Sequence, residues 1–560
     1  MRYLFMFTIG PVKAFIENSR KARDLYAGSK LLSELMEDCV TCLSQDDRIR
    51  LLFPAVSDED APPNMPNRLV AELTGYTDKQ IHDQAERLTV FVKKRFLKKC
   101  SGLFAAVGLK LEMFELAVRQ LEDFLEVFWV CVEYEEEPYH SAYQRLFTAM
   151  QDVKSIRDFS QIREPWGRKC MLYPQYNAIF AKKSMYDGTW KYPYHTNPDY
   201  VYDITEIPSL RYMVKEKEAL SAVGLVKRLY NRGAVRIYST RQMLLRKQVS
   251  SEMLKEAGIL ESDAVQMDMV ANAVYDLYNE NIPVEDEYTA EAAQVAERLY
   301  KMLREKQIRL SSYYCIIKFD GDNMGECFRN LETEEEQRQL SSNIDTFARL
   351  VPEIFLKYSG LPVFAGGEDF FGFLPLDHMF QCLEELYQKF GKVVGLTFSA
   401  GISVAHLMQP LKEVMEQVDS MEQVAKNRDG KQAFAIGIIK RSGETVRLPA
   451  FHLPEMRKGP GLKKMGELVR LLQDSGCPKS LFFQIADQLK YFIRENSAWL
   501  EPSMVEPLIV KCVSGAFVDD GLISRNELVK SLMDFYIESG STVDFLNTLN
   551  GITFLSREVN

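Results

Sequence analysis

The chain has little cysteine and histidine, and it has no long apolar run. It carries 10 cysteines and 6 histidines in 560 residues, and the cysteine spacing shows no disulfide framework. The apolar run nearest the start, Tyr3 to Ile9, leads directly into Gly10-Pro11, so we expect no signal peptide. No run approaches the roughly 20 apolar residues that cross a bilayer. These absences predict a cytoplasmic protein that has neither disulfide bonds nor a membrane partner.

An excess of positive charge is also absent. The 69 Lys and Arg residues are outnumbered by 79 Asp and Glu residues, which gives a formal net charge of −10. A free-standing protein that holds DNA through many phosphate contacts needs the opposite balance, so this class is excluded. Nucleic acid would have to be held in a local groove or through partner subunits. The length predicts several domains, because a single core stops growing well before 560 residues.

Two segments show the same predicted order of strands and helices. An apolar strand pattern over residues 2–9 is followed by a helical pattern, two short strands, a second helical pattern and a strand over 128–134. The order begins again at residue 313 and reaches a strand over 395–404, with a helix over 410–428 and a strand over 433–440 as extra elements. A β-α-β-β-α-β order is typical of the ferredoxin-like fold, in which two helices cover one face of a four-stranded antiparallel sheet.

We therefore predict an α+β protein with four parts. A first ferredoxin-like domain spans residues 1–165, and an inserted, mostly helical domain spans 166–308. A second ferredoxin-like domain follows over 309–452, and the helical pattern of 453–560 predicts a C-terminal helical domain.

Three acidic residues of the second repeat are predicted to converge. Asp320 ends the first strand, and Glu368 and Asp369 lie in the hairpin AGGEDFF between the middle strands. These strands are neighbours in a ferredoxin-like sheet, so the carboxylates would meet at one end. Gly366 and Gly367 permit a tight turn and let a phosphate approach the backbone. Hard oxygen ligands suit Mg²⁺ or Mn²⁺, and two such ions can promote an in-line displacement at phosphorus.

Each of these residues also has a plainer interpretation. An acid in a hairpin loop is commonly only solvated, and Asp322, just past the strand, is better explained as a turn former. Lys426, at the end of an amphipathic helix, and Lys431, across the following turn, could neutralise triphosphate charge. Exposed lysines at helix ends are more often simply solvated.

Two known families resemble this pattern. The GGEDF hairpin and Lys426 are similar to features of diguanylate cyclases, but NMGECFRNLE differs from the residues that come after the first metal-binding Asp in that family. The stretch FTIGPVKAFIENSRKARDLYAGSKLLSEL, from Phe7 to Leu35, resembles the signature of the large, polymerase-like subunit of type III-B (Cmr) CRISPR effector complexes. FDGDNMGE is similar to the first palm motif of that family, GGED replaces its usual GGDD, and residues 405–444 resemble its closing palm helix and strand.

The second resemblance implies a prokaryotic, cytoplasmic nucleotidyltransferase with two palm domains. On capture of target RNA it would convert ATP into a nucleotide second messenger, cyclic oligoadenylate, with release of pyrophosphate, for antiviral defence. Its partners would be the other type III-B subunits, the guide CRISPR RNA and the target RNA.

The resemblance also implies roles for particular residues. The catalytic, metal-binding set would be Asp320, Glu368 and Asp369, with two Mg²⁺ or Mn²⁺ ions. Nucleotide would contact Gly366, Gly367, Lys426 and Lys431 in the second palm, and Ser19, Arg20, Arg23, Asp24 and Ser29 in the first. For Arg23 and Asp24, an ordinary pair on a helix surface is the alternative.

Three departures from the family pattern shape the expectations. Members often begin with an HD nuclease domain, whereas this sequence starts at the first palm strand, so we expect no DNase activity in this chain. Tyr173 stands where a second zinc ligand would follow Cys170, so we expect no structural zinc. Glu368 in place of Asp keeps adenylyl transfer from ATP to S-adenosylmethionine as an alternative. A non-catalytic scaffold subunit and a diguanylate-cyclase-like enzyme are the other two alternative functions.

Overall fold

The chain forms two compact units in the computed structural model. The structure describes residues 1–55, 65–135, 137–156, 164, 167–182, 201–205, 207–215, 218–230, 238–259, 264–279, 288–366, 369–454, 461–473, 477–493, 499–516 and 524–558. The first unit comprises Met1–Arg309, Asn323–Arg349 and Val363–Gly367, and the second comprises Leu310–Asp322, Leu350–Pro362 and Glu368–Asn560. Within the described ranges, no helix is both long enough and apolar enough to traverse a bilayer.

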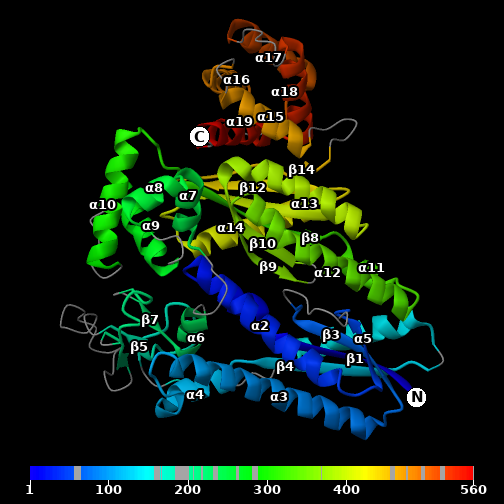
Figure 1. The fold of residues 1–560 in the computed structure, drawn as a ribbon. Helices are drawn as coiled ribbons and strands as arrows, with labels where there is room; N and C mark the ends of the chain where they lie inside the picture. Colours follow the sequence, from blue (N-terminus) through cyan, green and yellow to red (C-terminus); the bar gives the residue numbers. More distant parts are fainter. Residues whose placement is uncertain are drawn as a thin grey trace. The chain divides into compact units, whose positions relative to one another are not determined.

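The first unit contains a four-stranded antiparallel sheet. Its strands are β1 (Arg2–Gly10), β2 (Ile49–Phe53), β3 (Arg68–Thr74) and β4 (Glu126–Glu133), in the order β2-β3-β1-β4. Alternate residues of β1, such as Phe5 and Phe7, share a core with α2 (Ala22–Leu43) and α3 (Asp78–Ala105) (Figure 1). The strand order is the one that the β-α-β-β-α-β pattern predicted.

Shorter helices complete this sheet region. α1 (Val12–Glu17) precedes α2, and η1 (Leu111–Met113) and α4 (Glu115–Glu122) precede β4. α5 (Tyr139–Ser155) packs on β4 and β1. α3 begins where its sequence signals a start, because Thr77 and Gln80 form a reciprocal capping box.

The rest of the first unit is mainly helical, as predicted, but it also contains a small sheet. The helices are α6 (Ala222–Tyr230), α7 (Thr240–Gln248), α8 (Ser251–Ala257), α9 (Ala264–Tyr278) and α10 (Ala290–Glu305). The sheet pairs β5 (Phe180–Ala181), β6 (Tyr202–Asp203) and β7 (Ala219–Leu220) in the order β6-β5-β7. Strands of two residues are too short to show a periodicity, so the sequence did not predict them. Phe180 and Leu225 belong to the same apolar core as Phe7.

A second large sheet repeats the strand order of the first. β8 (Tyr313–Gly321), β9 (Leu361–Gly366), β10 (Asp369–Pro375) and β11 (Phe398–His406) lie in the order β11-β8-β10-β9. β12 (Ala433–Ile439) adds parallel to β11, and β13 (Thr445–Arg447) and β14 (Phe451–His452) pair with β12. α11 (Met324–Arg329) and α12 (Glu334–Lys357) follow β8, and η4 (Leu376–His378) and α13 (Met379–Val393) follow β10.

The two faces of this sheet have different chemistry. Phe319 stacks with Phe370 and Phe398, at ring-centroid distances of 4.9 and 4.3 Å, on the face against which α13 packs. α14 (Leu411–Lys426) covers the other face. A Cβ on Gly401 would meet the backbone N of Glu422 at 2.3 Å, so glycine is what lets this helix lie directly on β11.

The chain ends in helices, as its periodicity predicted. They are α15 (Leu462–Gln473), α16 (Ser480–Lys490), α17 (Pro502–Ala516), α18 (Arg525–Ser539) and α19 (Thr542–Glu558) (Figure 1, orange to red). α18 starts at a capping box made by Ser524 and Glu527.

Candidate functional site

Two of the three predicted acids meet across neighbouring strands. The register of β8 and β10 places Asp369 directly opposite Asp320. Residues opposite each other in an antiparallel pair project to the same face, with Cβ atoms about 4.5–5.5 Å apart. The predicted convergence of these two acids is confirmed. Gly367 and Glu368 lie outside the described residues, and Gly366 is described as the last residue of β9.

Lysine side chains lie among the carboxylates on the α14 face. The Lys426 ammonium contacts Asp320 and, at 2.9 Å, Glu422. Lys318 lies 2.6 Å from Asp419 and 3.2 Å from Glu422. Burial alone would lower the pKa of each lysine, but the neighbouring carboxylates raise it above its ordinary value. Both ammonium groups therefore stay charged, and they hold Glu422 between them.

The sequence predicted Lys426 as a site residue, but it did not predict Lys318 and Glu422, which belong to the same cluster of charged side chains. Lys318 precedes Asp320 by two positions on one strand, so the two side chains share a face. Glu422 precedes Lys426 by one helical turn. These spacings were visible signals, whereas the docking of α14 on this face required the structure.

Asp322 has the structural role that its position after the strand suggested. Its carboxylate accepts hydrogen bonds from Thr397 Oγ1 at 2.8 Å, Ser399 Oγ at 2.7 Å and the backbone N–H of Gln432 at 3.1 Å. This side chain ties the end of β8 to β11 and to the turn before β12. Lys431, in that turn, has a φ of 51°, so its backbone is in the left-handed region beside the end of α14.

The predicted residues of the first unit divide into buried and accessible groups. Ser19 and Asp24 are 3% and 1% exposed, and Ser29 is also buried. Arg20 is exposed and contacts the sulfur of Met171, and Arg23 pairs with Asp268 at 3.2 Å.

Asp24 belongs to a buried ion cluster. Its carboxylate lies 3.0 Å from Arg228, which also contacts Glu218 at 3.1 Å. Burial alone would raise the pKa of Glu218, but Arg228 and Lys21 lower it to about 2. The role of Asp24 as a nucleotide contact stays a prediction, and its observed contacts are with protein.

The donor set on the sheet fits a divalent cation that shares its ligands with a substrate. Asp320 and Asp369 supply two carboxylates, and Mg²⁺ is commonly held by one or two carboxylates together with substrate phosphates and water. Within the described ranges, no group of three His, Cys, Asp or Glu side chains is arranged to hold a metal ion. A substrate would therefore have to complete the coordination, and the role of Glu368 as a ligand stays a prediction.

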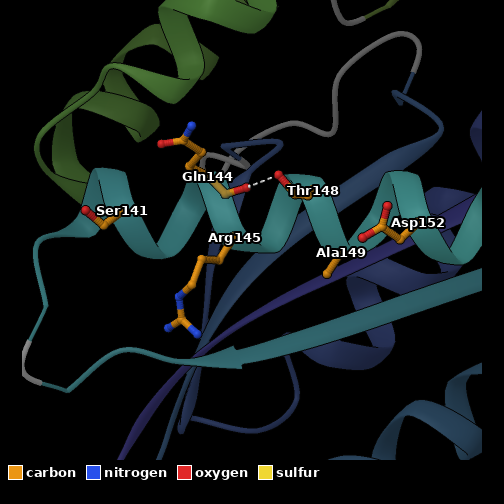
Figure 2. Close-up of a pocket in the computed structure, with 6 residues that line it drawn as sticks. All are labelled: Ser141, Gln144, Arg145, Thr148, Ala149 and Asp152. Atoms are coloured by element: carbon orange, nitrogen blue, oxygen red, sulfur yellow. Dashed lines mark hydrogen bonds between the residues drawn. The ribbon is translucent and has the colours of Figure 1, made fainter.

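A pocket of about 520 Å³ is lined by none of the predicted site residues. Figure 2 shows its lining side chains along α5, where Thr148 Oγ1 donates to the Gln144 carbonyl at 3.0 Å. Arg145 reaches the carbonyl of Glu133 at 2.6 Å. The lining residues are Ser141, Gln144, Arg145, Thr148, Ala149 and Asp152. They follow one face of a single helix and provide no cluster of catalytic groups.

Comparison with known families shows which proteins the two large sheets resemble. A family model described as Cas10/Cmr2, second palm domain, matches residues 313–435, and one described as CRISPR-associated protein Cmr2, N-terminal, matches residues 4–104. Both of these segments are therefore similar to Cas10/Cmr2 proteins. The first match includes both strands that carry Asp320 and Asp369, and the second includes the Phe7 to Leu35 stretch. The resemblance stated from the sequence is thereby confirmed, and the GGED hairpin is assigned to a Cas10/Cmr2 palm.

Individual relatives agree with the family match. The CRISPR system Cmr subunit Cmr2 of Pyrococcus furiosus is 22% identical over 637 aligned positions, which cover 95% of this chain and 71% of the relative. A chain of Type III-B Cmr-beta in the apo state has a TM-score of 0.66 at 13% identity, covering 99% of this chain and 82% of that one. For Cmr-beta bound to cognate target RNA, the TM-score is 0.67 at 14% identity, with 99% and 83% covered. These structures share the fold of this chain.

Proposed function

We propose that the chain is the large subunit of a type III CRISPR effector complex and that its second palm transfers adenylyl groups from ATP. The observation that carries the proposal is the cross-strand pair of Asp320 and Asp369 within the segment that matches a Cas10/Cmr2 second palm. A chain of similar fold belongs to Type III-B Cmr-beta bound to cognate target RNA. By analogy, guide RNA, target RNA and the other subunits are proposed as partners here.

Asp320 and Asp369, with Glu368, would hold Mg²⁺ or Mn²⁺. Such ions, when bound, activate an attacking hydroxyl and neutralise charge on the phosphates. A ribose hydroxyl of one nucleotide would lose its proton to solvent while its oxygen forms a bond to the α-phosphorus of ATP; the bond from that phosphorus to the bridging oxygen would break, and pyrophosphate would leave. Repetition of this step followed by ring closure would give cyclic oligoadenylate.

Lys426 is suited to bind the triphosphate. Its ammonium contacts Asp320 and remains charged, with 26% of the side chain exposed. It can therefore face a phosphate beside the carboxylates without a change in protonation. Glu422 and Lys318 hold the end of α14 against β8 and so fix the direction from which the Lys426 ammonium faces the triphosphate.

The proposed activity can be tested with the chain assembled with its partner subunits and guide RNA. Incubation with α-labelled ATP and Mg²⁺, with and without target RNA, is expected to give AMP-containing oligomers only when target RNA is present. Mass spectrometry of parallel reactions with S-adenosylmethionine decides the acceptor, because AMP joined to S-adenosylmethionine would overturn the cyclic product. If no reaction yields an AMP-containing product, the enzymatic proposal fails and the scaffold alternative stands.

Replacing Lys426 with alanine is expected to move metal and nucleotide affinity in opposite directions. Without the ammonium, the carboxylates of Asp320 and Asp369 attract a cation more strongly, whereas a triphosphate loses a charged partner. We expect the KM for ATP to rise about tenfold, because one charge-assisted contact is lost. Calorimetric titration with Mg²⁺ is expected to show tighter binding than in the wild type.

Lys412→Ala is the matched control for this experiment. Lys412 lies on the same helix, is 74% exposed and pairs only loosely with Glu416, at 3.8 Å. Its removal changes the charge of α14 equally without touching the site. An equal rise in KM in both variants would show that the effect of Lys426 is a general field effect.

A further inference from the structure

The connection between α1 and α2 leaves several backbone carbonyls to be satisfied from elsewhere. α1 has six residues, and α2 begins at Ala22. The last carbonyls of any helix have no partner within it, and a helix this short consists largely of its ends. The carbonyl of Asn18, in the connection itself, is in the same position. Ser19 partly closes the end, since its Oγ donates to the Ile16 carbonyl at 2.6 Å.

The Lys227 ammonium of α6 satisfies these acceptors. Its Nζ donates to the Phe15 carbonyl, to the Asn18 carbonyl at 3.0 Å and to Ser19 Oγ at 2.6 Å. An ammonium has three protons, which matches the three shortest contacts. The Ile16 carbonyl lies further away, at 3.3 Å. One side chain thus holds three successive parts of the connection.

The surroundings of Lys227 are shaped to accept it. The rings of Phe15 and Tyr173 lie with centroids 5.3 and 5.8 Å from its Nζ. Tyr173 Oη also donates to the Phe15 carbonyl, at 3.1 Å. A Cβ on Gly28 would meet that carbonyl at 3.1 Å and Lys227 Cε at 3.4 Å. The glycine therefore lets α2 lie close to the backbone of α1, beside the lysine.

A buried ammonium is costly compared with an apolar side chain of the same size. Lys227 is 1% exposed, and burial lowers its pKa to about 7. Stability alone would favour a leucine or methionine in a protein core. The contacts of this lysine are instead directed at the backbone carbonyls of Phe15 and Asn18 and at the Ser19 hydroxyl.

The next residue of α6 holds the other end of the same stretch. Arg228 contacts Asp24 through two nitrogens, each at 3.0 Å, while Glu218 neutralises its remaining side at 3.1 Å. Ser19 and Asp24 are therefore both fixed from α6. Arg20 and Arg23, which lie between them in sequence, are carried by the segment that these two anchors define.

We propose that Lys227 is a positioning residue that fixes the connection between α1 and α2 and so sets how Arg20 and Arg23 meet a nucleotide triphosphate at the first palm. The proposal rests on the proposed function and adds one step to it, namely that a nucleotide also contacts Arg20 and Arg23, as the family resemblance implies. Ser19 and Asp24 then serve as the anchor points of the segment, and the two arginines as its ligand contacts.

Lys227→Met tests this role, because methionine fills similar space without a donor. Hydrogen exchange of peptides spanning residues 15–24 is expected to become faster in the assembled complex. The KM for ATP is expected to rise about tenfold while kcat stays within about twofold, since misplaced binding groups weaken ground-state binding. Leu229→Ala is the control: Leu229 is a buried residue of the same helix, and its side chain donates no hydrogen bond to the connection, so the KM is expected to stay within about twofold of the wild-type value.

Tyr173→Phe is a milder variant if Lys227→Met does not assemble. It removes the hydroxyl that donates to the Phe15 carbonyl and keeps the ring. We expect changes in the same direction and of smaller size. Unchanged exchange and an unchanged KM would overturn the proposal, and so would faster exchange with an unchanged KM. If the wild type makes no AMP-containing product, the proposed function itself has failed, whereas an active wild type with an insensitive KM refutes only the role of Lys227.

Discussion

Asp369→Asn is expected to reduce ATP turnover by about 100-fold or more while leaving the fold intact. Asparagine keeps the size and the cross-strand position of Asp369 opposite Asp320 but removes one negative charge. A divalent cation depends on that charge, because neutral amide oxygens are weaker ligands than carboxylates. Asp369 is exposed at the start of β10, so little packing changes. Turnover of α-labelled ATP by the assembled complex measures the loss.

One control variant and one change of metal concentration test whether this loss comes from metal binding. Asp487→Asn makes the same chemical change at a 70% exposed position on α16 and is expected to retain full turnover. Raising the Mn²⁺ concentration is expected to restore part of the activity of Asp369→Asn, because weakened metal binding is overcome by mass action. Wild-type turnover in the Asp369 variant would contradict the assignment of this carboxylate and favour a palm kept only as a scaffold.

The repeated sheet could be predicted because its strands carry a clear local signal. β1, β8 and β11 are continuous buried strands of nine residues each, followed by turns or amphipathic helices, and this order admits few topologies. The opposition of Asp320 and Asp369 then follows from strand adjacency. The position of α14 on the far face depended on Gly401, whose close approach to Glu422 a single sequence does not reveal.

The contacts of the predicted site residues in the first unit could not be predicted from the sequence. Ser19 lies in the connection between α1 and α2, and Asp24 lies at the start of α2, in a stretch whose sequence pattern presents both as a possible binding surface. Their partners, Lys227 and Arg228, come from about 200 positions later in the chain. Long-range pairing of this kind leaves no periodicity. The same chain separation concealed the shared core that joins Phe180 and Leu225 to the first sheet.

The buried cluster around Arg228 is also expected to respond to acid. The pKa of Glu218 is lowered from 4.5 to about 2 because Arg228 and Lys21 outweigh the effect of burial. A carboxyl with a depressed folded-state pKa stabilises the fold fully above its unfolded pKa, and this contribution is lost as the pH falls toward the folded value. The first unit should therefore lose stability from this group between about pH 4.5 and pH 2.

Asp24→Ala is expected to destabilise the first unit by about 3–5 kcal/mol, because it leaves a buried guanidinium with one of its two carboxylate partners removed. Arg228 is 4% exposed and retains Glu218 at 3.1 Å, so the loss should fall toward the lower end of that range. The two compact units make a single two-state transition a poor description of the whole chain. Hydrogen exchange of α2 amides gives the local free energy of opening instead.

A double-mutant cycle separates the ion pair from the space that Asp24 fills. The double variant Asp24→Ala/Arg228→Met also removes the buried guanidinium that Asp24→Ala leaves with one carboxylate partner. Its loss of stability is therefore expected to be smaller than the sum of the losses in the two single variants. The coupling between two residues in direct contact is expected to be about 1–3 kcal/mol. Additive single effects would show that Asp24 acts only through packing, and the anchoring of α2 by α6 would then rest on Lys227 alone.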